Sequence, residues 1–107
     1  MKRLLPLILL LLSACSEPLP ADKEIYAGDW EGPGMLLSIS SDGRLYYQRA
    51  QGSSSTSLDV PIQRFEGDNI VAGLGPASAT FVVSQRPHPE QGEWVMVVDG
   101  VRLVRQE

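Results

Sequence analysis

The alternation of apolar and polar positions from Tyr26 onward predicts short β-strands. Gly, Pro, Asp and Ser interrupt each apolar run before a helical period can be sustained. We therefore expect an all-β domain over residues 25–107, built as a small antiparallel meander of about seven strands. The expected strands cover residues 35–40, 44–49, 58–62, 70–72, 80–84, 94–98 and 101–104.

Two Asp-Gly pairs mark the hairpins of this meander. Asp42-Gly43 and Asp99-Gly100 each lie between two alternating runs, and Asp-Gly in that position is the strongest short hairpin signal. The Gly/Ser/Thr tract over residues 51–57 and the polar stretch over residues 86–92 predict loops. Pro61 lies inside an alternating run, which predicts an edge strand or a β-bulge.

The N-terminal fourteen residues have the pattern of a secretory signal peptide. Lys2 and Arg3 form a short basic start, residues 4–12 form an apolar run broken only by Pro6, and two small residues follow. The run is shorter than the roughly 20 apolar residues that a membrane-spanning helix needs. We expect residues 1–14 to form a signal helix that is cleaved off.

The sequence Leu12-Ser13-Ala14-Cys15 resembles the lipobox of bacterial lipoproteins. The resemblance implies that the Cys15 thiol receives a diacylglyceryl group, that signal peptidase II cuts before Cys15, and that the new amine is acylated, commonly with palmitate. Two or more acyl chains hold a protein firmly on a membrane. Ser16 stands where an Asp marks inner-membrane retention in enterobacterial lipoproteins, which favours the outer membrane, facing the periplasm. The alternative is an ordinary secretory signal whose Cys is incidental.

The charge balance of the chain excludes some partners. The formal net charge is −4, and loss of Lys2 and Arg3 with the signal peptide would make it −6. Nucleic-acid binders present a basic face, so an acidic chain disfavours DNA and RNA. Residues 15–24 hold two prolines and four charged residues, and we expect them to form a lipidated Cys and a flexible spacer of roughly 30 Å at about 3.3 Å per residue.

Gly28-Asp29-Trp30 ahead of a β-meander resembles the Gly-x-Trp opening of lipocalin-like domains. The resemblance implies that Trp30 plugs one end of a barrel. The chain departs from true lipocalins because roughly 80 residues cannot form eight long strands around a ligand cavity, so a barrel of this size would be packed solid. A small twisted sandwich and an ordinary core role for Trp30 are the alternatives.

The sequence offers few groups for catalysis or cofactor binding. His88, the only histidine, lies between Pro87 and Pro89 in an expected exposed loop with no identifiable partner. One Cys and one His exclude the usual Cys/His zinc sites, and the serines of residues 53–57 have no Gly-x-Ser-x-Gly elbow. We therefore expect no enzymatic activity, no metal and no cofactor, although Asp29, Glu31, Glu90 and Glu93 could pair as acids.

Binding to a partner is the remaining function class. Adjacent Tyr46 and Tyr47 point to opposite faces of a strand, so one of them should be exposed, flanked by Arg44, Gln48 and Arg49. Arg86 and His88, in a loop stiffened by prolines, form a second candidate contact. The alternatives are an ordinary cross-strand aromatic pair and a stiff hairpin connection.

These observations predict a monomeric, lipid-anchored envelope protein whose β domain binds an envelope protein or has a structural role. A lipocalin-like carrier of a small hydrophobic molecule is the first alternative, and an enzyme inhibitor or enzyme is the second. Large inward-facing residues favour a filled interior over a ligand cavity. These residues are Met35, Leu37, Ile39, Leu58, Val60, Ile62, Phe81, Val83, Trp94, Met96 and Val98.

Overall fold

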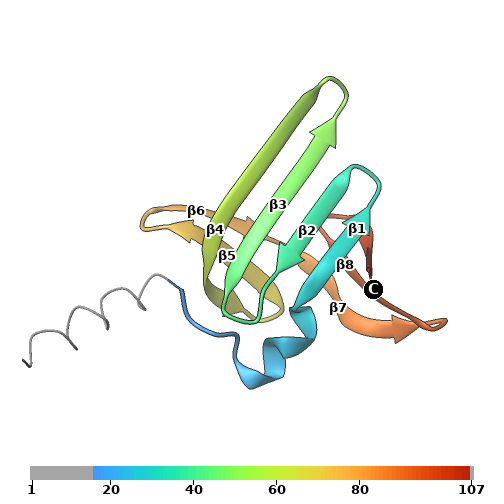
Figure 1. Cartoon of the computed structure of the whole chain (residues 1–107), viewed down its shortest axis with the longest axis horizontal. Helices are drawn as coiled ribbons and strands as arrows, with labels where there is room; N and C mark the ends of the chain where they lie inside the picture. The colour runs from blue at the N-terminus through green and yellow to red at the C-terminus, as the bar shows by residue number, and fades with distance from the viewer. Residues whose placement is uncertain (1–15, 107) are drawn as a thin grey trace, which may run out of the picture.

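In the computed structural model, which describes residues 16–106, nine antiparallel strands form one sheet that curls into a half-barrel (Figure 1). The all-β prediction is confirmed, with nine strands in place of about seven. A short 3-10 helix, η1 (Ala21–Tyr26), precedes the sheet. The strands are β1 (Gly28–Gly32), β2 (Met35–Ile39), β3 (Arg44–Gln51), β4 (Ser54–Glu66), β5 (Asn69–Leu74), β6 (Ala77–Phe81), β7 (Val83–Glu90), β8 (Glu93–Val98) and β9 (Val101–Arg105).

The curl of the sheet follows from its strand order, β6-β5-β4-β3-β2-β1-β9-β8-β7. β6 and β7 lie at opposite ends of this order, although only Val82 separates them along the chain. Asp99 fixes this junction, because its carboxylate accepts the Val82 N–H at 2.9 Å and its own N–H donates to the Val82 carbonyl at 2.8 Å. The two ends of the sheet are therefore held close together at this junction, and the sheet must curl.

Both predicted Asp-Gly hairpins are present. Asp42-Gly43 lies in the turn between β2 and β3, and Asp99-Gly100 joins β8 to β9. Asp99 and Gly100 have φ values of 50° and 82°. Positive φ at both central residues defines the type I′ turn, whose twist matches that of the strands it joins.

Residues 51–57, which we expected to form a loop, belong instead to a long hairpin. β3 continues to Gln51 and β4 begins at Ser54, and the register pairs these two residues. The end of this hairpin projects past the other strands at the top of Figure 1. Ala50 to Ser57 are exposed, so neither face of this part carries the apolar alternation that marks a strand in sequence.

Residues 86–92 are the second loop prediction that was wrong, since β7 extends from Val83 to Glu90. Its pairing with β8 shifts register between Val83 and Gln85 and again between Gln85 and His88. β-Bulges of this kind accommodate prolines, which have no N–H to donate. Pro87 is buried.

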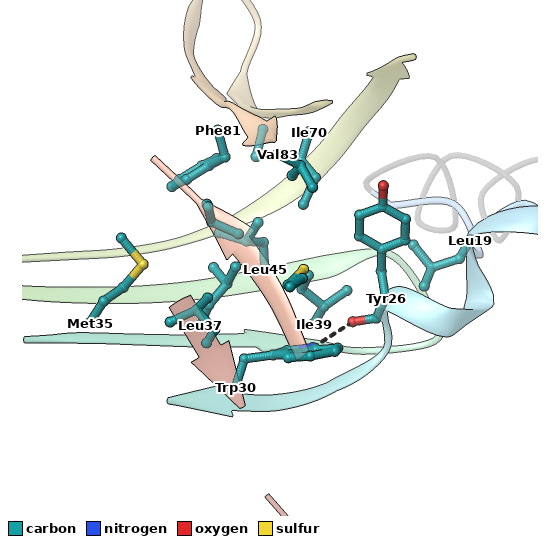
Figure 2. Close-up of a cluster of buried hydrophobic side chains, with 14 residues drawn as sticks. Leu19, Tyr26, Trp30, Met35, Leu37, Ile39, Leu45, Ile70, Phe81 and Val83 are labelled. Atoms are coloured by element: carbon teal, nitrogen blue, oxygen red, sulfur yellow. Dashed lines mark hydrogen bonds between the residues drawn. The ribbon is translucent and has the colours of Figure 1, made fainter. Parts of the chain in front are cut away.

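The core fills the inner face of the half-barrel. Seven of the predicted inward residues are buried there, and Leu58, Val60, Ile62 and Trp94 pack against them partly buried. Trp30 is fully buried, and its Nε1–H donates to the Tyr26 carbonyl at 2.9 Å (Figure 2). Further members of the core that the sequence did not single out are Leu19, Tyr26, Leu45, Ile70, Ala72 and Leu103.

The segment before β1 packs onto the half-barrel and differs from the extended spacer that we expected. Leu19 is buried beside Tyr26 (Figure 2), and its N–H donates to the Ser41 carbonyl at 3.0 Å. The Tyr26 hydroxyl donates to the Asp68 carbonyl at 2.8 Å. The folded unit therefore begins before residue 20. Between residues 16 and 106, no helix is long and apolar enough to cross a membrane.

The buried Tyr26 hydroxyl should make stability depend on pH in the alkaline range. Burial, followed by the nearby Asp68 carboxylate, raises the pKa of Tyr26 from 10.0 to about 12. The folded state therefore holds the phenol proton after the unfolded state has lost it. The contribution is complete below about pH 10 and is lost as pH rises toward the folded-state pKa.

The variant Tyr26→Phe isolates this effect. It loses a hydrogen bond, which costs about 1 kcal/mol near neutral pH. The difference in urea midpoint between wild type and variant should then shrink as pH rises from 9 to 12. Parallel pH curves for the two proteins would contradict this assignment.

Candidate binding surface

Tyr46 lies on the outer face of the half-barrel, in a row of four side chains. Residues directly opposite each other on antiparallel strands share a face. Tyr46 lies opposite Ser38 on β2 and Asp59 on β4, and Ser38 lies opposite Asp29 on β1. We call Asp29, Ser38, Tyr46 and Asp59 the Tyr46 row. Tyr46 is 38% exposed, as we expected for one residue of the tyrosine pair.

Ion pairs and hydrogen bonds hold the polar members of this row. The Arg44 guanidinium bonds the Asp59 carboxylate at 2.9 Å and the Asp59 carbonyl at 3.2 Å. The Ser38 hydroxyl donates to the Asp29 carboxylate. A surface hollow of about 270 Å³ lies over Tyr46, Arg44 and both carboxylates. Two carboxylates against one guanidinium give this part of the outer face a net negative charge.

Tyr47 and Arg49 lie on the other side of the sheet from Tyr46. Tyr47 lies opposite Leu37 and packs its ring edge-on against Phe81, with a centroid distance of 5.0 Å. Arg49 lies opposite the buried Met35 and is half-buried. The expectation that Arg49 flanks the exposed tyrosine is therefore wrong, because three positions along a strand reverse the face.

Arg86 and His88 lie on β7, and β2, β1, β9 and β8 stand between β7 and the strand that carries Tyr46. The five predicted contact residues thus do not form one surface. His88 lies in a strand, half-buried, instead of an exposed loop. Its Nδ1 lies 2.7 Å from the Arg86 carbonyl. A carbonyl only accepts, so Nδ1 carries the proton and donates.

Two carboxylates in the described chain have a clearly lowered pKa. A hydrogen bond from Arg102, at 2.7 Å, is the main cause that lowers the pKa of Glu90. A hydrogen bond from Lys23 does the same for the pKa of Asp22. Both carboxylates are exposed, so these pairs contribute little to stability. Over residues 16–106, no group of three His, Cys, Asp or Glu side chains is placed to hold a metal ion.

Cys15, the predicted lipidation site, lies outside the described residues. The described chain continues from Ser16, and Leu19, four residues after Cys15, is already buried. Four residues span at most about 13 Å. Along the sequence, only Ser16, Glu17 and Pro18 separate Cys15 from this buried side chain.

A second hollow, of about 260 Å³, opens on the inner face where β4, β5 and β6 meet. Apolar side chains and a few backbone groups line it, including Leu58, Val60, Ala72 and Ala79. Neither this hollow nor the carboxylates beside Tyr46 could be predicted from the sequence. Register decides which side chains share a face, and a single sequence does not give the register between strands.

The chain was also compared with known proteins. A scan against protein-family models, a search of curated proteins and a search of solved structures each found no match.

Proposed function

We propose that this protein is a lipid-anchored lipoprotein of the bacterial envelope whose β domain is a non-catalytic binding module. The lipobox-like Leu12-Ser13-Ala14-Cys15 sequence supports this proposal. A lipid on Cys15 would hold the η1 end of the domain within about 13 Å of the anchor. The β3–β4 hairpin, at the opposite end in Figure 1, would then point away from the membrane. Ser16 favours the outer membrane, with the domain in the periplasm.

The outer face around Tyr46 is the first candidate for partner contact. An exposed Tyr with a neighbouring Arg is typical of the residues that contribute most to protein interfaces. The carboxylates of Asp29 and Asp59 outnumber the Arg44 guanidinium, so complementarity favours a partner with positive charge at its contact.

Lipid labelling tests the anchor. Cells that express the full-length chain are grown with a palmitate analogue, and the label on the protein is measured. Wild type should be labelled and should sediment with the membrane fraction. Cys15→Ser should carry no label and should leave uncleaved precursor, because Cys15 is the only thiol of the chain.

Ser13→Ala serves as the matched control, since it keeps a small residue in the lipobox and should leave labelling intact. A labelled Cys15→Ser protein, or an unlabelled wild type, would overturn the proposal.

The lipocalin-like carrier is the second candidate, favoured by the apolar hollow on the inner face. Its volume of about 260 Å³ lies just below the roughly 300 Å³ at which ligand pockets begin. A bound hydrophobic molecule in the purified protein would support this candidate.

A further inference from the structure

The outer edge of β6 is an unpaired strand edge. β6 pairs with β5 along all five of its residues and ends the sheet, and no strand of the described chain lies on its other side. Ala77 to Thr80 are exposed. An edge strand presents a row of free N–H and C=O groups onto which another strand can add.

The two edges of this sheet differ in how they are protected. Natural sheets protect their edges with prolines, charged side chains and bulges. The edge strand β7 has all three, in Pro87 and Pro89, in Arg86 and in its two register shifts. β6 has the sequence Ala-Ser-Ala-Thr-Phe and pairs with β5 without a register shift. Residues 74–83 hold no charged side chain, so β6 is the unprotected edge.

An apolar surface lies beside this edge on the inner face. Ala79 lies opposite Ala72, a core residue, and Ala77 lies opposite Leu74. The face that forms the core therefore continues onto small, exposed side chains at β6, and the 260 Å³ hollow opens there. Leu74, which lies opposite Ala77, is 65% exposed.

The shape of this surface decides which kind of strand fits. A second copy of this chain, paired antiparallel about Ala79, would place Ala79 against Ala79 and Ala77 against Phe81. Phe81 is already buried in its own core, so in this register a second copy brings only the small side chains of Ala77 and Ala79 to the hollow. A strand with large apolar side chains at alternate positions does fill it, because alternate residues share a face.

We propose that β6 binds an extended segment of another protein, which adds as a further antiparallel strand beside Ala77–Phe81. Its inward side chains are large and aliphatic or aromatic, and lie over Ala77 and Ala79. Its flanks are neutral or basic, since the chain has a net charge of −4. Backbone pairing with pockets for alternate side chains is an established mode of peptide recognition. This inference rests on the proposed binding role and is independent of lipid at Cys15.

Peptide binding to the full-length protein tests this inference. The probe is a fluorescent nine-residue peptide in which Leu alternates with Thr between terminal lysines. Its two control versions carry N-methyl groups on the Leu residues or on the Thr residues, which blocks backbone pairing along one edge or the other. Wild type should bind the probe and only one of the methylated peptides, and the β6 amides should become protected from hydrogen exchange.

Variants of the edge locate the site. Ala79→Asp places a carboxylate in the hollow and should weaken binding at least tenfold. Ala79→Leu fills the hollow with a side chain of the protein itself and should weaken binding to a similar degree. This second variant tests the site even if Ala79→Asp does not fold. Ser84→Asp, on the protected strand β7, is the matched control and should change the affinity less than twofold.

Three results would overturn the inference. The first is equal binding of the unmethylated peptide and both methylated peptides, or no binding of any of them. The second is a dimer of wild type that Ala79→Asp dissociates, because a second copy would then occupy the edge. The third is a small hydrophobic molecule in the purified protein that the peptide does not displace. Cys15→Ser should bind the peptide like wild type, so failure of the lipid anchor and failure of strand addition are separate results.

Discussion

Replacing Trp30 with alanine is expected to lower the free energy of unfolding by about 3–5 kcal/mol, the usual cost of removing a buried Trp side chain. Trp30 is fully buried, and its Nε1–H bonds the Tyr26 carbonyl at 2.9 Å. It lies opposite Leu37 on β2 and Arg105 on β9, so it packs where the first strand of the chain pairs with the last one. A domain of this size has a free energy of unfolding of about 5–13 kcal/mol. The loss would therefore be a large fraction of the total stability.

Urea denaturation followed by circular dichroism measures this loss, with Trp94→Ala as the comparison. Trp94 is half-buried and stacks on Arg105, whose guanidinium carbon lies 4.9 Å from its ring centroid. Its removal should cost about 1–2 kcal/mol. Equal losses for the two variants would contradict the structural difference between these tryptophans.

The sequence predicts those strands that have one buried face. β2 alternates buried and half-buried residues along its length, and that burial is what produces the alternating pattern. β8 and β9 alternate less regularly, since Val95 and Met96 are both buried. An Asp-Gly turn joins these two strands, so their hairpin could still be predicted from local residues alone. In these elements, local preference and tertiary packing agree.

The missed strands lack a local signal. β1 has two glycines, two acidic residues and only Trp30 as an apolar residue, and it forms a strand because β2 and β9 pair with it on both sides. The beginning of β4 is exposed on both faces and depends on pairing with β3. Tertiary pairing decides such segments, and propensity does not.

The candidate sites depend on the register between strands more strongly than the strands themselves do. That one of two adjacent tyrosines is exposed follows from the pleat of a strand. The placement of Asp29 and Asp59 beside Tyr46 follows from three strand pairings, and residues 29 and 59 are far apart in sequence. The edge of β6 is open because β6 ends the sheet, and no local pattern of residues predicts which strand ends a sheet.

Substitution of Leu19 or Gly43 is expected to give the second large loss of stability, because the N-terminal segment packs on the turn that contains Gly43. Leu19 is 7% exposed, and Leu19→Ala should cost about 2–4 kcal/mol. Gly43 has a φ of 92°, and a β-carbon there would lie 1.9 Å from the Glu17 carbonyl oxygen. Gly43→Ala therefore strains the turn and displaces residues 17–19, at a cost of about 2 kcal/mol or more.

The two substitutions should not be additive. Once Gly43→Ala has displaced the segment, Leu19 no longer packs fully, so Leu19→Ala should remove less stability in that background. We expect the double variant to lose about 1–2 kcal/mol less unfolding free energy than the sum of the two single losses. Leu103→Ala is the matched control, since Leu103 contacts the Gly32 end of β1, at the other end of β2 from the Gly43 turn. Its loss should add to that of Gly43→Ala. Urea denaturation of the five variants and wild type measures the cycle, and additive losses for Leu19 and Gly43 would show that the segment does not depend on this turn.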